Sequence, residues 1–537
     1  MAHLLCLPTE VLLQIVSLLS SNADLAALAI QCRRLYSITD MKTRKRYHRI
    51  RVTNSTKHLG HAFVLLVEIL KQPLLGRYVR HIEYFEPLAR CYSQYKPKNF
   101  LNELDMPVVR AAIEQAGFRS ADVKRLVKVF TQIFRVVERV EKEGHQPGRL
   151  FEVDEPFLAQ TLTALLISVS PDVVSMALTQ PYPTADAMHW YDDALETEPA
   201  TLPLYWFLYQ INNNDDFPAP GRPKLLTKLR NVYMINEREE VYWYEDRFYY
   251  PMDLFGFMTL FHRLPSIESI CTDALEADVD GRRGFPFASS HISRIHIHHS
   301  LIGDLDLARL ICSCKQLREF RYSIGGRATG RDPIATLNDY RTICQALLIH
   351  RATLEILDLN AAEQDSQWSA VVEDDVDENL EERRDQEPFF WGDEDLSDSE
   401  DNVAVPAWIW EQSGSLKDFS ALKLLAVDIN FLLYMARGVN SARDKGCELA
   451  GRLPPSLESL LIRGYESGRN KNHDNQVASL RALKSDQVST TLRDIQGVDQ
   501  TITPAMHVED PDRDRHLLWF REEEEWSEED EDIEVSE

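Results

Sequence analysis

A short pattern of apolar residues recurs along the chain and constrains its fold more than any other feature. Each copy reads apolar-x-x-apolar-x-apolar, which is typical of a short strand with one buried face. Eight copies share this form: Val173–Leu178, Leu229–Met234, Ile267–Thr272, Ile292–Ile297, Leu317–Tyr322, Leu354–Leu359, Leu422–Val427 and Leu457–Ile462. Val79–Tyr84 has the same form and is a possible earlier copy. The sequence therefore predicts a series of similar strands.

The spacing of these copies indicates how the strands are connected. From Ile267 onward they start 25, 25, 37, 68 and 35 residues apart, and helical stretches such as 305–314 and 337–350 lie between them. One strand and one helix cannot bury their apolar faces alone, but stacked neighbours can. Because 25 residues falls within the range of leucine-rich repeats, we expect an α/β fold over 151–510. It would be an irregular leucine-rich-repeat solenoid, with parallel strands on the concave side and helices on the convex side. An unrelated α/β fold is the alternative.

The N-terminal segment has a different pattern. Pro8 and Glu10 suit the first turn of a helix, and the apolar residues from Val11 to Leu19 are too dense for a single stripe. Residues 21–24, Ser-Asn-Ala-Asp, can end that helix and cap a second one. So short a segment cannot bury this much apolar surface alone. It must pack against the rest of the chain or against another protein.

This segment resembles the F-box. The shared features are Leu7-Pro8-x-Glu10-Val-Leu with Ile15, the Leu18-Leu19 pair, Asp24-Leu25, and Cys32-Arg-Arg. The resemblance implies a three-helix F-box over residues 1–45 that docks on a Skp-type adaptor and, through it, on a cullin–RING ubiquitin ligase core. It implies adaptor contacts from Leu7, Pro8, Glu10, Ile15, Leu18, Leu19, Leu25, Leu28 and Cys32. An ordinary amphipathic hairpin that opens a helical domain is the alternative.

One group of F-box proteins combines the F-box with irregular leucine-rich repeats, and the order of segments in this chain resembles that architecture. Residues 416–423 and 453–460 look like those of its filamentous-fungal members. The resemblance implies a non-catalytic substrate receptor of an SCF-type ligase, in which the solenoid holds an unidentified protein target and partner proteins transfer ubiquitin. Two alternatives stay open: an adaptor-bound scaffold that works outside a ligase, and an enzyme that uses a cleft of the solenoid.

The remaining segments complete the predicted organisation. Residues 46–150 form a helical linker region with a possible first repeat, and helices are expected at 58–71, 107–116, 121–143 and 156–169. Residues 361–405 are rich in Asp, Glu and Ser and are expected to be a disordered acidic insertion. Residues 511–537 are an acidic tail.

The formal net charge of −26 is concentrated in two segments. Residues 373–401 carry −13 and residues 521–537 carry −10, which leaves the rest of the chain nearly neutral. Binding of nucleic acid through a basic face therefore has no support. No uncharged apolar run reaches 18 residues, so no transmembrane helix is expected.

The cysteines and histidines suggest no cofactor. Eight cysteines are scattered without a repeated spacing, which favours a reducing compartment, either cytoplasm or nucleus. His296 and His298 alternate with Ile295 and Ile297, so both histidines should lie on one face of a strand. A metal site would need a third ligand, and none can be named. We expect no metal, no cofactor and no catalytic residue in this chain.

Overall fold

The computed structural model describes most of the chain. The described residues are 4, 7–19, 22–53, 56–85, 106–118, 123–124, 126–127, 155–182, 202–218, 223–235, 252–273, 284–300, 302–324, 340–360, 406–439, 448–485 and 491–503. The chain divides into two compact units. Unit 1 comprises Met1–Pro181 and Glu198–Leu229, and unit 2 comprises Tyr182–Thr197 and Arg230–Glu537.

Unit 1 begins with four short helices: α1 (Thr9–Leu18), α2 (Asn22–Ala29), α3 (Arg33–Thr39) and α4 (Met41–His48). Pro8 occupies the N-cap of α1 and Glu10 lies in its first turn, as the sequence predicts. Leu12 and Val16 of α1 are buried, together with Leu25 of α2 and Leu35 of α3. We call α1 to α3 the N-terminal hairpin.

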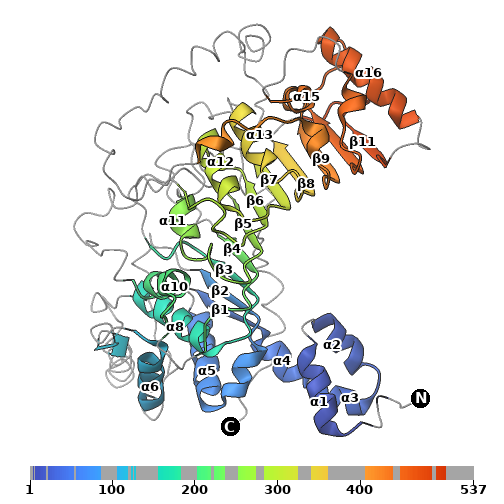
Figure 1. Ribbon diagram of the computed structural model, residues 1–537. Helices are drawn as coiled ribbons and strands as arrows, with labels where there is room; N and C mark the ends of the chain where they lie inside the picture. Colours follow the sequence, from blue (N-terminus) through green and yellow to red (C-terminus); the bar gives the residue numbers. More distant parts are fainter. Residues whose placement is uncertain are drawn as a thin grey trace, which may run out of the picture. The chain divides into compact units, whose positions relative to one another are not determined.

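The rest of unit 1 combines three parallel strands with helices (Figure 1). Strand β1 (Arg49–Thr53) pairs with β2 (His81–Phe85), which pairs with β3 (Ser175–Leu178). The connecting helices are α5 (Thr56–Lys71), η2 (Pro73–Tyr78), α6 (Met106–Ala116), α8 (Glu155–Val169) and α10 (Pro203–Asn213). Ile50, Ile82 and Met176 are in register and fully buried, so they form the central layer of this core.

Unit 2 contains eight strands stacked in chain order (Figure 1). They are β4 (Asn231–Met234), β5 (Ser269–Asp273), β6 (Arg294–His298), β7 (Glu319–Ser323), β8 (Ile356–Asn360), β9 (Leu424–Asp428), β10 (Ser459–Arg463) and β11 (Asp494–Gln496). Every neighbouring pair is parallel. The α-helices are α11 (Leu254–Met258), α12 (Asp304–Ser313), α13 (Tyr340–Leu348), α15 (Ile429–Arg437) and α16 (Lys471–Ser485), and the 3₁₀ turns are η7 (Ala407–Ile409), η8 (Leu416–Asp418) and η9 (Leu449–Arg452).

Each predicted copy of the apolar pattern contains a strand that begins two residues after the copy starts. In the copy that contains β7, for example, Leu317, Phe320 and Tyr322 are at most 1 % exposed. The first apolar residue of each copy lies in the turn, and the next two point from the strand into the core. A mixed α/β fold with a parallel sheet is therefore confirmed.

Two strands escaped the sequence prediction. Strand β1 lies in Tyr47-x-x-Ile50-x-Val52, which has the same apolar form but follows a basic helix. Strand β11 follows Leu492, and Gly497 stands at its third apolar position. A Cβ atom at Gly497 would lie 1.9 Å from the Ile462 carbonyl oxygen, and the φ of +82° also favours glycine. Because β10 packs this closely against Gly497, the third apolar position of this copy cannot hold a side chain, and the sequence pattern is incomplete there.

Residues of alternating charge precede the strands of unit 2. The residues one position before β7 to β11 are Arg318, Glu355, Lys423, Glu458 and Arg493. The backbone N–H of each donates to the carbonyl oxygen of the residue that stands at the same position before the preceding strand. The Lys423 Nζ lies 2.6 Å from the Glu355 Oε2. Neighbouring strands thus start with opposite charges side by side, which supports their register.

The predicted helices at 58–71, 107–116 and 156–169 correspond to α5, α6 and α8. Only residues 123–124 and 126–127 of the helix expected at 121–143 are described, and they are helical. The acidic insertion 361–405 and the acidic tail 511–537 lie outside the described residues. Within the described part of the chain, no helix is long and apolar enough to cross a membrane.

Candidate functional site

The N-terminal hairpin is closed by an arginine of the Cys-Arg-Arg motif. The Arg34 guanidinium donates from Nη2 to the Leu7 carbonyl oxygen at 3.0 Å and to the Thr9 Oγ1 at 3.4 Å. These hydrogen bonds join the start of α3 to the start of α1. Arg34 therefore positions the Leu-Pro segment, a role that the sequence analysis did not assign.

The structure brings the predicted adaptor contacts together on this hairpin but gives them different exposure. Pro8 and Glu10 are exposed, and Leu25 is 1 % exposed and belongs to the hairpin core. The partly exposed residues are Leu7, Ile15, Leu19, Leu28 and Cys32. Leu18 lies in α1, but its side chain is outside the described residues.

Four exposed large apolar side chains of the hairpin were not in the predicted set. Ile30 is 79 % exposed, Tyr36 60 %, Leu13 48 % and Val11 36 %. Val11 and Leu13 flank the buried Leu12, so the dense apolar run of α1 supplies both a core face and a solvent face. We use the name apolar surface of the hairpin for these four residues and Pro8, which are exposed on α1, just before α1, after α2 and on α3. Exposed apolar side chains lose contact with water when a partner covers them, so these residues are candidates for contact with a partner.

A polar cluster fixes α4 to α5 within unit 1. The Arg46 Nη2 lies 2.6 Å from the Glu68 Oε1, and the Tyr47 hydroxyl donates a short hydrogen bond to the Glu68 Oε2. Burial and this hydrogen bond raise the pKa of Tyr47 to about 12, so its hydroxyl keeps its proton. Since α4 leads directly into β1, the cluster anchors the helical segment to the sheet of unit 1.

A second candidate surface is the side of the unit 2 strands that carries polar residues. Ile295 and Ile297 of β6 are buried, whereas His296 and His298 are partly exposed. The prediction that both histidines share one strand face is confirmed. In register with His296 lie Cys271 of β5 and Arg321 of β7, and Asp358 of β8 lies beside Arg321. We call this side the polar strand face.

Ion pairs connect this face across several strands. Glu319 Oε1 lies 3.0 Å from the His296 Nε2 and 2.6 Å from the Arg321 Nε. Asp358 lies 3.8 Å from the Arg321 Nη1 and, through its other oxygen, 2.8 Å from the Arg463 Nη2. The imidazole of His296 and the guanidinium of Arg321 hold the pKa of Glu319 near 2 against partial burial. The charges of this face therefore largely satisfy one another.

The two histidines of the polar strand face differ in their charge state. Burial works against the imidazolium of His296, but its contacts with Cys271 and Glu319 outweigh burial and raise its pKa to about 9. Burial lowers the pKa of His298 to about 4, and its Nδ1 lies 3.2 Å from the Ser323 Oγ. His299, next along the chain, contacts Asp273 through its Nδ1 at 3.2 Å. No group of three or more His, Cys, Asp or Glu among the described residues is arranged to hold a metal ion.

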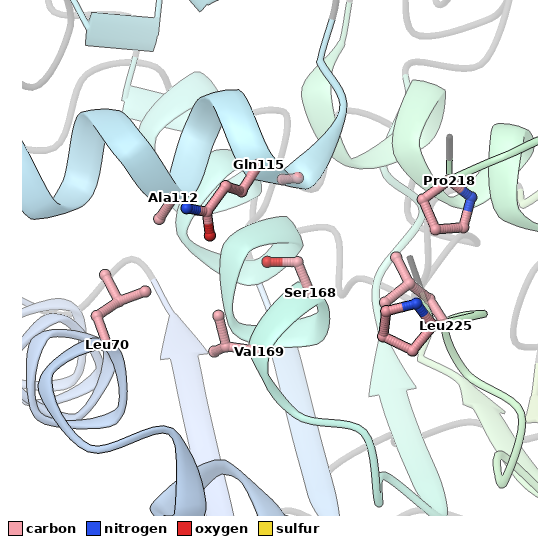
Figure 2. Close-up of a pocket in the computed structure, with 9 residues that line it drawn as sticks. Leu70, Ala112, Gln115, Ser168, Val169, Pro218 and Leu225 are labelled. Atoms are coloured by element: carbon pink, nitrogen blue, oxygen red, sulfur yellow. The ribbon is translucent and has the colours of Figure 1, made fainter. Parts of the chain in front are cut away.

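Unit 1 also contains a cavity of about 270 Å³ (Figure 2). It lies between α5, α6, the end of α8 and the segment after α10, and Gln115 and Ser168 are its polar side chains. The lining residues are Leu70, Ala112, Gln115, Ala116, Ser168, Val169, Pro218, Pro223 and Leu225. None of these nine is titratable, so the cavity lining offers no acid–base group, and the Ser168 hydroxyl donates to the Leu165 carbonyl oxygen at 2.7 Å with no base in the lining to activate it.

A comparison with protein families matches this part of the chain. The F-box-like family model matches residues 4–49. The chain contains an F-box-like domain. The match covers α1 to α4 and the first residue of β1, so the exposed apolar side chains belong to the matched part. F-box domains in general bind Skp-type adaptors. No curated protein is similar enough to this chain to count as a relative.

Proposed function

We propose that this protein is the substrate-recognition subunit of an SCF-type cullin–RING ubiquitin ligase. The observation that carries the proposal is the match of residues 4–49 to the F-box-like family, combined with the exposed apolar surface of the hairpin. The chain holds the target, and partner proteins transfer ubiquitin. In this role the chain contributes no catalytic residue.

The adaptor-binding residues are the nine that the resemblance implies, with Leu25 acting through the core of the hairpin. To these we add Val11, Leu13, Ile30 and Tyr36 because they are the large apolar side chains that the hairpin exposes. Burying a large apolar side chain stabilises a complex by roughly 1.5–3 kcal/mol before association costs are subtracted. A few such residues can therefore carry the docking free energy.

Target recognition is assigned to an irregular leucine-rich-repeat solenoid of the filamentous-fungal type over residues 151–510. The parallel strands in chain order support this assignment, as do the 25-residue intervals before β6 and β7. The polar strand face is the target-binding surface because its side chains are fixed by cross-strand ion pairs and still partly exposed.

The test is an affinity purification of the full chain beside the Leu7→Ala/Pro8→Ala double variant, with bound proteins identified by mass spectrometry. A ligase receptor brings down both a Skp-type adaptor and a cullin, and the double variant loses both together. Proteins that both samples retain are target candidates. Adaptor without cullin would replace the ligase role with that of a scaffold. Adaptor binding that survives the double variant would contradict the docking assignment.

A further inference from the structure

The segment from α4 to η2 in unit 1 carries a local excess of positive charge. Residues 41–78 contain nine Lys and Arg and one acidic residue, Glu68, which gives a net charge of +8 in a chain whose formal net charge is −26. Screening limits the reach of exposed charges to roughly 10 Å at 0.1 M salt. The local charge, and not the net charge of the whole chain, therefore decides what this segment attracts.

The three helices of this segment adjoin one another. Arg44 of α4 lies over the ring of Tyr78 at the end of η2, with 4.8 Å between the guanidinium carbon and the ring centroid. Arg46 of α4 pairs with Glu68 of α5, and a single residue separates the end of α5 from the start of η2. The cations of the three helices therefore share one region of the surface of unit 1.

Positive groups lie close to one another where α4 leads into β1. Burial lowers the pKa of His48, the last residue of α4, and neighbouring positive groups, Arg80 among them, lower it further. The charge of Arg80 also works with burial to lower the pKa of Arg44. This edge of unit 1 is therefore electropositive as a result of its structure as well as its composition.

A large apolar side chain stands among these cations. Leu74 of η2 is 73 % exposed. Residues three apart in a 3₁₀ helix eclipse one another, so Leu74 and Arg77 lie on the same side of η2. Lys71, at the end of α5, is exposed three residues before Leu74. An exposed leucine is thus flanked along the chain by two exposed cations.

The other side of η2 is fixed against unit 1. Gly76 is buried, and a Cβ atom there would lie 2.0 Å from the Val169 carbonyl oxygen at the end of α8. Because the backbone packs this closely, η2 cannot turn over and bury Leu74 in the core. The structure therefore holds Leu74 and Arg77 outward.

We propose that η2 and α4 form a docking surface for a lipid bilayer rich in anionic headgroups. Leu74 enters the boundary between headgroups and acyl chains, while Lys71 and Arg77 lie at the level of the headgroups. The exposed lysines of α4, Lys42 and Lys45, add to the attraction. An acidic protein segment would pair with the cations but would give Leu74 no apolar environment, whereas a bilayer surface supplies both. Such binding needs no membrane-spanning helix and does not depend on the proposed ligase role.

The test is sedimentation of the full chain with vesicles of phosphatidylcholine, either alone or with about 30 % phosphatidylserine. At about 0.1 M salt we expect at least about tenfold stronger binding to the vesicles that contain phosphatidylserine, and loss of this preference at about 1 M salt. Leu74→Asp should weaken binding at least about tenfold, because a buried leucine contributes that much or more. The Lys71→Gln/Arg77→Gln double variant should weaken it roughly twentyfold, since each cation near an anionic surface contributes about fivefold.

Two matched controls change equally exposed residues elsewhere. Ile30→Asp places the same charge on a side chain of the hairpin that is 79 % exposed, and Arg351→Gln/Lys417→Gln removes two exposed cations of unit 2. Both should bind vesicles within about twofold of the wild type. Circular dichroism checks that each variant is folded.

Three results would overturn the proposal. The first is the absence of binding to either kind of vesicle. The second is an equal loss from Leu74→Asp and Ile30→Asp, which would show that the apolar contact is not made by η2. The third is a preference for phosphatidylserine that survives in the Lys71→Gln/Arg77→Gln variant.

Discussion

The N-terminal hairpin and the polar strand face of unit 2 present opposite kinds of surface. The hairpin exposes Ile30, Tyr36 and Leu13. Their apolar surface contributes favourable free energy only when a partner removes it from water. The strand face exposes charged groups that already pair with one another, such as Glu319 with Arg321 and His296. Apolar burial suits one constant partner. Paired charges contribute little net affinity but discriminate strongly between partners.

The largest effect is expected from breaking the core of unit 2 while leaving the hairpin intact. Phe320→Ala removes a fully buried ring from β7 and should lower the free energy of unfolding of unit 2 by about 3–5 kcal/mol. Adaptor binding through the hairpin should survive at temperatures where unit 1 stays folded. Chemical denaturation and adaptor binding measure the two effects.

The control for this prediction is Phe287→Ala, which removes an aromatic ring of unit 2 that is 38 % exposed. It should cost less than about 1 kcal/mol. Equal losses from Phe320→Ala and Phe287→Ala would show that the strand core is not where the stability of unit 2 resides.

The charges of the polar strand face should give the stability of unit 2 a pH dependence. Since the pKa of His296 is raised to about 9, its contribution to stability is complete below pH 6.5 and is lost as the pH rises through 9. The difference in unfolding free energy between wild type and His296→Gln should therefore shrink from pH 6 to pH 10, by on the order of 2 kcal/mol. Urea unfolding at both pH values measures it. A difference that does not change with pH would contradict the ion-pair account.

The smallest of these effects concerns the hydrogen bonds that close the hairpin. Arg34→Ala removes donors to Leu7 and Thr9, and exposed hydrogen bonds of this kind contribute about 1 kcal/mol. Adaptor affinity should fall roughly fivefold to tenfold because the Leu-Pro segment loses its position. Arg33→Ala, at the adjacent exposed position, is the matched control and should change affinity less than about twofold. Similar losses in both variants would mean that charge, and not position, explains the effect.

The sequence predicted most strands because the three apolar positions of each copy are the residues that the fold buries. The prediction failed where a neighbour replaced the apolar side chain, as the Ile462 backbone does at Gly497. It also missed β1, whose apolar residues directly follow the basic helix α4. Within residues 46–150, expected to be a helical linker region with a possible first repeat, β2 lies in the possible copy Val79–Tyr84, whereas β1 was not expected.

The candidate sites were harder to predict than the strands. Composition shows that α1 is too apolar for one stripe, but only the packing of α1 against α3 decides that Leu12 is buried and Leu13 exposed. The contact of Cys271 with His296 depends on strand register, which joins residues 25 positions apart. His296 and His298 were correctly placed on one face, but contacts with Cys271 and Glu319 raise the pKa of His296 whereas burial lowers that of His298, and alternation alone reveals neither.

The most direct test of the central claim is the affinity of the full chain for a purified Skp-type adaptor, measured by calorimetry for two matched variants. Ile30→Asp places a charge on the apolar surface of the hairpin, and Leu74→Asp does the same at a residue of unit 1 that is 73 % exposed in η2. We expect Ile30→Asp to weaken binding at least about a hundredfold and Leu74→Asp to leave it within about twofold. Equal affinities for wild type and Ile30→Asp would contradict the assignment of the hairpin as the docking site.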